Sequence, residues 1–519
     1  MLAQLLRRKN VDEASADAEA PGGRLKRSLG PIDLTALGVG GIIGAGIFSA
    51  TGAAAAGKFD AAGHMLRPGA GPALILSYGL TAVACGFAAL CYAELASMIP
   101  IAGSAYTYAY VTLGELLAWI IGWDLILEYG VGNVAVAVSW SGYFQDLLAG
   151  FGLHLPGWMV TNYNHLTPEL SAAAPHLFGA PLVFNFPAFA IVALLTVLLV
   201  IGIRESARFN AVMVFLKVLL VIGFIAVGAF YVKPTNWHPF VPNGFTGIMT
   251  GASLVFFAYI GFDAVSTTAE EAKNPQRDLP IGMIASLIVC TILYVAVTAV
   301  LTGMMPYTKL GVDDPLTAAL QYAGLPNAAG LLAFGAVIAM TAVLLVFQLG
   351  QPRIFLSMAR DGLLPKFAAK VHPRFGTPHV TTIITGVLVG GVAMFVDIND
   401  AIEFTNIGTL FAFVLVSAGV IVLRRTDPDR PRPFRCPGVP LVPILSIVCC
   451  VGLMIPLPVV TWIRFVGWLA IGLVLYFLYG KHHSRLGRAA AVATTQSQGT
   501  GSQSTKLPKA STVKRPPTR

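Results

Sequence analysis

Charged residues are scarce in this chain, and their scarcity excludes an ordinary soluble protein. Only 11% of the 519 residues are Asp, Glu, Lys or Arg, whereas 56% are hydrophobic. A soluble globular domain usually carries about 25% charged residues. Apolar runs of about 18 or more residues recur along most of the chain, and each is long enough to cross a bilayer as a helix.

Cysteine and histidine are also too few and too scattered to build a reactive centre. The six cysteines include no C-x-x-C pair, and most lie inside apolar runs, so we interpret them as small packing residues. His154, His165 and His176 share the segment 147–183, where solvated loop residues are favoured over a metal site. No nucleophile and base stand at a usable spacing. We therefore expect no metal ion, no cofactor and no enzymatic activity.

The apolar runs predict an all-α integral membrane protein with twelve transmembrane helices. Backbone polar groups must be satisfied within any segment that crosses lipid, and a helix does this by itself. The lipid bilayer is thus an expected partner of most of the chain. The predicted spans are approximately residues 33–57, 71–98, 115–146, 184–203, 209–232, 246–269, 281–305, 327–350, 380–397, 401–423, 439–460 and 463–480.

Basic residues are distributed unevenly between the two ends of these helices. With the N-terminus in the cytoplasm, 28 of the 34 Lys and Arg residues fall inside and five outside, and Lys217 lies within a span. The positive-inside rule therefore predicts cytoplasmic N- and C-termini. This bias, with a basic tail at 481–519 that we expect to be disordered, explains the net charge of +9 without a nucleic acid partner.

Ionisable residues at membrane depth are few, and each suggests a function. Lys217 lies eight residues into the fifth span, about 12 Å deep at 1.5 Å per residue. A proton carrier or a structural cation is favoured there over a lysine that snorkels to the interface. Glu128 is either a pocket or proton-relay carboxylate or a structural hydrogen bond between helices. For Asp124 the structural interpretation is favoured, and Glu94 is expected at the cytoplasmic interface.

The first span contains an unusual run of glycines, "VGGIIGAGIFSATG", at residues 39–52. A dinucleotide-binding loop is excluded, because Gly44 comes one residue too late after Gly38 and Gly40 and no strand precedes them. Close helix packing through Gly40 and Gly44 is possible but is a weak signal. A discontinuous helix is the third interpretation, since unwound backbone is tolerated in a membrane where it lines a cavity.

A second interruption in the sixth span favours the discontinuous helix. Gly261 lies near the middle of that span, and Asp263 is placed to cap a new half-helix. The two interruptions occupy equivalent positions in two five-helix halves, which would run in opposite directions. Interrupted helices at matching positions of inverted repeats are typical of a transporter site at the membrane midplane.

With these features the chain resembles the amino acid–polyamine–organocation (APC) superfamily, and within it bacterial members of the cationic amino acid transporter family. Four stretches carry the resemblance, and together they extend over residues 30–480: "GVGGIIGAGIF", "ESARFNAVMVFLKV", "FAYIGFDAVSTTAEEAKNPQRDLPIG" and "GQPRIFLSMARDGLLP". The resemblance implies a LeuT-like 5+5 inverted-repeat fold with broken helices 1 and 6 and two additional C-terminal helices. It also implies a bacterial inner membrane and an amino acid substrate.

The resemblance also implies the residues of the substrate site. The substrate carboxylate would meet the amides around Gly44, Ala45 and Gly46. The α-amine would meet carbonyls around Ile43, Phe257, Ala258 and Ile260. Phe257 and Tyr259 are candidates for an aromatic gate, and bulk at Gly44 or Gly46 is expected to abolish binding without unfolding the protein.

Three more residues concern coupling and specificity. Lys217 matches a lysine that, in proton-coupled relatives, takes the place of a sodium ion, and Glu128 matches an acid near the pocket. Met340 would line the side-chain pocket and make it apolar, although Glu128 remains a possible acceptor for a cationic side chain. We therefore favour small or medium neutral amino acids over Arg and Lys.

The resemblance implies proton-coupled amino acid uptake by alternating access, with amino acid and protons as partners. Exchange or facilitated passage without proton coupling is the alternative, and a monomer is compatible with either. The expected organisation is a cytoplasmic segment 1–30, a first repeat 31–232, a second repeat 233–430, two further helices 431–480 and the tail 481–519.

Overall fold

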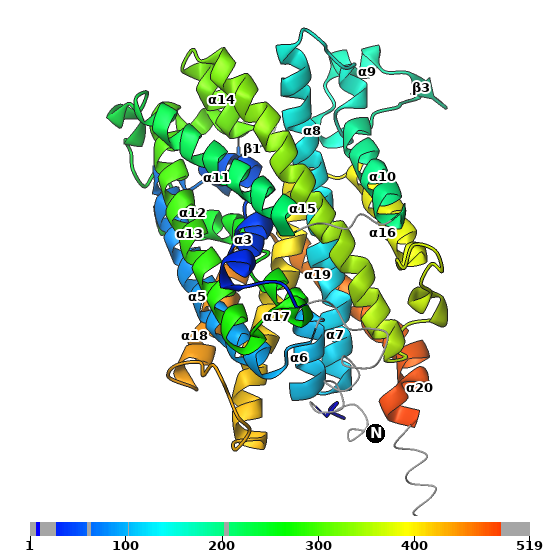
Figure 1. Cartoon of the computed structure of the whole chain (residues 1–519). Helices are drawn as coiled ribbons and strands as arrows, with labels where there is room; N and C mark the ends of the chain where they lie inside the picture. The colour runs from blue at the N-terminus through cyan, green and yellow to red at the C-terminus, as the bar shows by residue number, and fades with distance from the viewer. Residues whose placement is uncertain (1–6, 11–26, 60–63, 102, 202–206, 489–519) are drawn as a thin grey trace, which may run out of the picture.

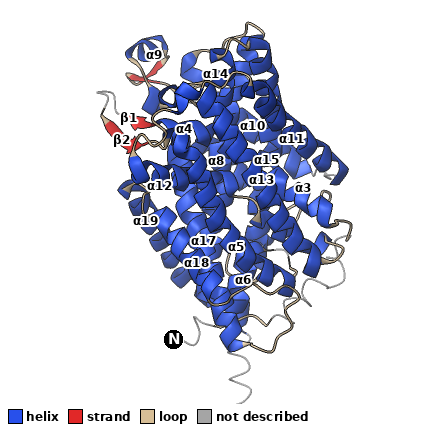
Figure 2. Ribbon diagram, turned by 90° about the vertical axis from the view of Figure 1, so that its left-hand side faces the viewer, coloured by secondary structure: helices blue, strands red, loops and turns tan. Residues whose placement is uncertain are grey.

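The computed structural model describes residues 7–10, 27–59, 64–101, 103–201 and 207–488. The chain forms an elongated bundle of helices (Figure 1). Two small hairpins and short helices cap one end of the bundle (Figure 2), and residues 481–483, labelled α20 in Figure 1, lie at the opposite end, which we call the terminus end.

Each of the twelve predicted spans contains an apolar helix in the described residues. Eight spans are long enough to cross a membrane: Gly71–Met98, Glu115–Gly150, Ala211–Ala229, Gly244–Ala269, Pro275–Met304, Pro326–Arg360, Ile398–Thr426 and Val459–His483. A ninth is a bent pair, Pro31–Ile42 with Gly46–Ala56. The remaining three are shorter apolar helices: Phe186–Ile201, His379–Ala393 and Leu441–Met454.

The elements of the first half are, in order, α3 (Pro31–Ile42), the π-helical turn η1 (Gly46–Ala50), α4 (Thr51–Ala56), β1 (Gly57–Phe59), β2 (Met65–Pro68), η2 (Gly71–Ala73), α5 (Leu74–Met98), α6 (Ser104–Thr112), α7 (Glu115–Ile126), the π-helical turn η3 (Leu127–Val131), α8 (Gly132–Gly150), η4 (Gly157–Met159), η5 (Tyr163–His165), α9 (Pro168–Ala173), β3 (His176–Leu177), β4 (Ala180–Pro181), α10 (Phe186–Ile201) and α11 (Ala207–Ala229).

Those of the second half are η6 (Pro234–Trp237), α12 (Gly244–Val255), η7 (Phe256–Tyr259), η8 (Asp263–Glu271), α13 (Pro275–Met304), η9 (Tyr307–Lys309), α14 (Pro315–Tyr322), α15 (Pro326–Arg360), η10 (Lys366–Ala369), α16 (His379–Ala393), α17 (Ile398–Thr426), α18 (Leu441–Met454), α19 (Val459–Leu475), the π-helical turn η11 (Tyr476–Gly480) and α20 (Lys481–His483).

Several helices extend past the apolar runs that predicted them. Helix α15 continues about ten residues beyond the predicted end at residue 350, and α13 begins at Pro275 rather than at residue 281. The added turns are amphipathic or polar, so apolar content alone does not reveal them.

The terminus end of the bundle is held by polar contacts among distant segments. Lys9 forms an ion pair with Asp361 at 3.2 Å, and Arg7 donates to the carbonyl of Gly487. The Ser484 hydroxyl donates to the carboxylate of Glu115. Residues 481–488 are therefore packed, whereas the predicted disordered tail began at 481; the part of it at 489–519 lies outside the described residues.

Glu94 differs from its predicted interfacial position. Its side chain is fully buried, and both carboxylate oxygens accept from the Arg424 guanidinium, at 2.9 and 2.8 Å. Arg432 and the backbone amide of Cys436 add two more contacts. The loop after α17 folds back over Glu94, so its charge is paired inside the protein rather than in water.

Candidate functional site

The first span is broken where the glycines predicted it. Helix α3 ends at Ile42, and the chain bends by 41° before a second helix starts at Gly46. Among the described residues, no backbone carbonyl accepts from the amides of Gly44 and Ala45, and the carbonyl of Ile43 accepts no backbone amide. These polar groups are buried, since Ile43 and Ala45 are at most 1% exposed. They form a cluster of donors and acceptors available to a ligand.

The sixth span is broken at the predicted glycine. Helix α12 continues into the 3₁₀ turn η7, and the chain then passes through Gly261 at φ +116° before η8 begins. The carbonyl of Ile260, like that of Ile43, accepts no backbone amide among the described residues. Asp263 is the first residue of η8 rather than its N-cap, which is Phe262, and no side chain caps this helix.

The two breaks pack directly against each other. A Cβ built on Gly46 would lie 2.6 Å from the Cβ of Ala258 and closer still to its Cα. A Cβ on Gly261 would lie 2.9 Å from the carbonyl carbon of Gly41. Only glycine allows such close approach of two backbones. The structure thus brings Gly44, Ala45 and Gly46 to the segment that carries Phe257, Ala258 and Ile260.

Gly261→Ala is expected to lower stability by about 1–3 kcal/mol, because φ +116° is strained for an L-residue and the new Cβ would overlap Gly41. Thermal unfolding of the purified protein measures this change. Gly86→Ala on α5 is the control, since its Cβ would meet nothing within 4 Å. Equal melting temperatures for the two variants would contradict the described break.

Two side chains satisfy carbonyls that the first break leaves open. The Lys217 ammonium, 3% exposed on α11, donates to the carbonyl of Gly40 at 2.8 Å. The Tyr294 hydroxyl of α13 donates to the carbonyl of Ile42 at 2.8 Å. A helix end leaves its last four carbonyls without intrahelical partners. Lys217 therefore points into the bundle at the break, which contradicts the snorkelling alternative.

Met340 lies near η1, the turn that follows the first break. Its sulfur accepts from the Ser139 hydroxyl at 3.1 Å, and Ser139 contacts the hydroxyl of Ser49 on η1. Val343 lies one turn further along α15 and packs against Gly44. A Cβ built on Gly44 would lie 3.1 Å from Cγ2 of Val343. The sequence did not single out Val343, because an apolar residue in an apolar helix carries no signal.

Glu128 lies in a separate group of carboxyls. Its electrostatic neighbours are Asp263, Asp124 and Thr409. Asp124 lies against α17, where a Cβ on Gly408 would come within 2.9 Å of its Oδ1. Glu128 belongs to η3, and Ser139 follows it by 11 residues, a rise of about 16 Å along a helix. Glu128 is thus about three turns from Ser139, which contacts Met340, whereas its neighbour Asp263 lies two residues after Gly261 of the second break.

The aromatic gate candidates have different surroundings. The Tyr259 hydroxyl donates to the carbonyl of Tyr78, and the Tyr259 ring packs edge-on against Tyr78 and Tyr294. These contacts make Tyr259 part of the packing between spans 2, 6 and 7. Phe257 keeps 5% of its surface exposed, more than either of its neighbours along η7.

The chemistry of this site is recognition rather than bond making. Within the described residues no group of three or more His, Cys, Asp or Glu side chains has an arrangement that would hold a metal ion. Both breaks are buried, so a ligand can enter only if the helices around them move. Paired backbone donors and acceptors of this kind suit a zwitterion.

The chain matches the model of the amino acid permease family over residues 29–478. It belongs to that family. The permease is 50% identical over 487 residues to the branched-chain amino acid permease BcaP of Bacillus subtilis, which covers 94% of this chain and all of the relative. It is 48% identical, with the same coverage, to the methylthioribose transporter of that organism.

A plant relative is more distant. The permease is 40% identical over 443 residues to a vacuolar cationic amino acid transporter of Arabidopsis thaliana, which covers 84% of this chain and 68% of the relative. The predicted membership of the APC superfamily is therefore confirmed. The permease is a multi-pass membrane protein, and it is a transporter rather than an enzyme.

Proposed function

We propose that this permease carries L-amino acids into the cell together with protons by alternating access. The observation that supports the proposal is the pair of facing helix breaks. The substrate carboxylate binds the amides of Gly44, Ala45 and Gly46, where the helix Gly46–Ala56 presents its positive end. The α-amine binds the open carbonyls of Ile43 and Ile260, with those of Phe257 and Ala258 nearby.

The side-chain pocket is apolar in this proposal. Met340 contacts the first break through Ser139 and Ser49, and Val343 lies against Gly44. We place Phe257, the neighbour of Ala258 on η7, in the same pocket. Glu128 neighbours Asp263 rather than Met340, so in this proposal it does not accept from a cationic substrate side chain. Neutral aliphatic amino acids therefore fit better than Arg or Lys.

Met340→Ala is expected to widen this pocket and shift preference toward larger side chains by about tenfold or more. One extra or missing methylene in a hydrophobic pocket is worth about 1–3 kcal/mol of discrimination. Competition of labelled substrate uptake by a series of unlabelled amino acids measures the shift. An unchanged order of competition would place Met340 outside the pocket.

Proton coupling is assigned to Lys217. Its ammonium holds the Gly40 carbonyl at the end of α3, so loss of its proton weakens a contact that fixes the first break. Protonation then acts on Gly40, four residues before Gly44, where the substrate carboxylate binds. In the alternative, exchange without proton coupling, Lys217 is a fixed cation.

The proposed orientation places both termini in the cytoplasm of a cell with the permease in its inner membrane. The basic loops lie at the terminus end, where the Lys9–Asp361 ion pair closes the bundle. Residues 31–232 and 233–430 form two inverted repeats, and the helices around the two breaks rock against the remainder. The helices of residues 431–480 follow the repeats.

A thermal-shift screen of the purified permease against the twenty amino acids and methylthioribose tests this function. A ligand at 100 times its Kd stabilises the folded state by about 2.7 kcal/mol. Branched-chain amino acids are expected to raise the melting temperature most, and uptake into proteoliposomes then tests transport. A shift with methylthioribose alone would show that the site serves a different substrate class.

A further inference from the structure

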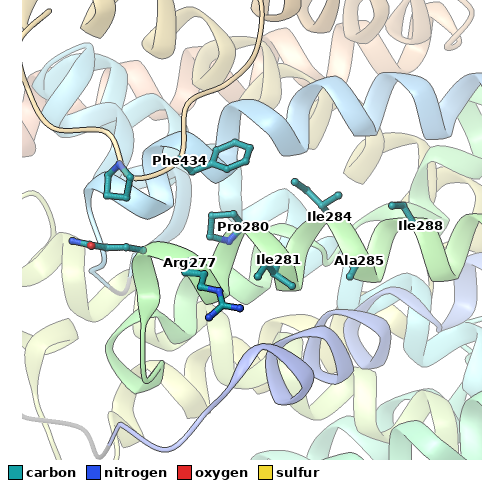
Figure 3. Close-up of a pocket in the computed structure, with 9 residues that line it drawn as sticks. Arg277, Pro280, Ile281, Ile284, Ala285, Ile288 and Phe434 are labelled. Carbon is teal, nitrogen blue, oxygen red and sulfur yellow. The ribbon is translucent and has the colours of Figure 1, made fainter.

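A groove on the outside of the bundle has no role in the proposed transport cycle. It lies along the first half of α13, where the segment after α17 crosses it, and has a volume of about 540 Å³. Figure 3 shows Phe434 on one side of the first turns of α13 and the Arg277 guanidinium on the other. The Phe434 amide donates to the Ser97 hydroxyl at 3.3 Å, which fixes that wall to α5.

The lining residues of α13 form a stripe along one face of the helix, which is charged at one end and apolar over the rest. Arg277 is followed on the same face by Ile281, Ile284 and Ile288, with Ala285 between the last two. Arg277 and Ile288 are 11 residues apart, a rise of about 16 Å. One leaflet of the hydrocarbon core is about 15 Å thick. The stripe therefore matches one acyl chain that lies along the helix with its headgroup at Arg277.

The charges at the headgroup end favour an anion. Arg277 is exposed, and no acidic side chain lines the groove. Within the described residues the Arg277 and Arg435 guanidiniums form no ion pair. By contrast, Arg424 and Arg432 of the same region both form ion pairs with Glu94. Arg435 directly follows Phe434 and is also exposed. The Arg277 guanidinium thus lines the groove, and Arg435 is next in the chain to Phe434 of its wall.

We propose that this groove binds an anionic phospholipid of the leaflet at the terminus end. The phosphate pairs with Arg277, Arg435 lies at the headgroup level, and one acyl chain follows the isoleucine stripe past Ala285. A free anion would use the arginines alone, and a zwitterionic lipid would use the stripe but gain less from the charges. The proposal does not depend on which substrate the permease carries.

Native mass spectrometry of the full-length protein in a neutral detergent tests the proposal by titration with phosphatidylglycerol. Arg277→Gln is expected to weaken the first binding event about fivefold, the loss of one basic residue near an anionic headgroup. Ala285→Trp fills the groove and is expected to weaken the same event at least as much. Arg425→Gln, which removes an exposed arginine of α17 outside the groove, is expected to leave it unchanged.

Two comparisons distinguish the sources of the anion. Phosphatidylcholine is expected to bind more weakly and equally well to the wild type and Arg277→Gln. Inorganic phosphate in millimolar excess is expected not to displace phosphatidylglycerol. Equal effects of Arg277→Gln and Arg425→Gln would overturn the proposal, as would displacement by inorganic phosphate. Because Arg277 is on the surface, its variant is expected to unfold at the wild-type temperature.

Discussion

Lys217→Met is expected to abolish substrate accumulation driven by a pH gradient while leaving the permease folded. Methionine nearly matches lysine in length, so packing around α11 is kept, but the Gly40 carbonyl loses its donor at 2.8 Å. An unsatisfied buried carbonyl costs about 1–3 kcal/mol. In proteoliposomes, the wild type is expected to concentrate substrate when the outside is acidic, whereas the variant reaches only equal concentrations.

Lys233→Met is the matched control for this experiment. Lys233 follows the other end of α11 and is exposed, so removing its charge changes no buried contact. Gradient-driven accumulation should then stay at the wild-type level. If Lys217→Met accumulates substrate as Lys233→Met does, proton coupling does not pass through Lys217 and the exchanger alternative gains support.

Gly46→Ala is expected to eliminate transport altogether. The new Cβ would overlap the backbone of Ala258. The two breaks would therefore have to move apart to accommodate it. Overpacking of this kind costs about 1–3 kcal/mol. Uptake of the substrate found by the screen should fall to background, and the melting temperature should fall as well.

Gly44→Ala separates loss of binding from loss of folding. The three atoms nearest to its Cβ would all belong to the Val343 side chain, the first at 3.1 Å, and a side chain can yield by a few tenths of an ångström. The melting temperature is therefore expected to stay close to that of the wild type while substrate affinity falls. We therefore keep the prediction that bulk leaves the protein folded for Gly44, but no longer expect it for Gly46. A fully active Gly46→Ala variant would contradict the close approach of the two breaks.

Much of the architecture follows from local features of the sequence. The apolar runs predict all twelve helical stretches, because the bilayer demands about 20 apolar residues from each span. The breaks at Gly44 and Gly261 are also predictable, because glycine in a membrane helix is costly unless the backbone there is used. The depth of Lys217 follows from its position in its span.

The contacts between distant segments could not be predicted from local features of the sequence. Nothing in the residues around Lys217 indicates that its partner is the carbonyl of Gly40, 177 residues earlier. The π-helical turn that carries Glu128 has no sequence signature, although such turns often mark functional sites. The sequence predicts an interfacial position for Glu94, because its partners Arg424 and Arg432 are more than 300 residues later in the chain. Pairing of this kind depends on how the helices pack.

The central claim is that backbone amides at the first break hold the substrate carboxylate. Isothermal titration of the wild-type permease with its best amino acid ligand, and with the amide of that amino acid, tests the claim most directly. The amide keeps the side chain and the α-amine but lacks the negative charge. We expect the amino acid to bind at least about tenfold more tightly, since hydrogen bonds to a charged group are worth about 1.5–3 kcal/mol. Equal affinities would contradict the assignment of Gly44, Ala45 and Gly46 as the carboxylate site.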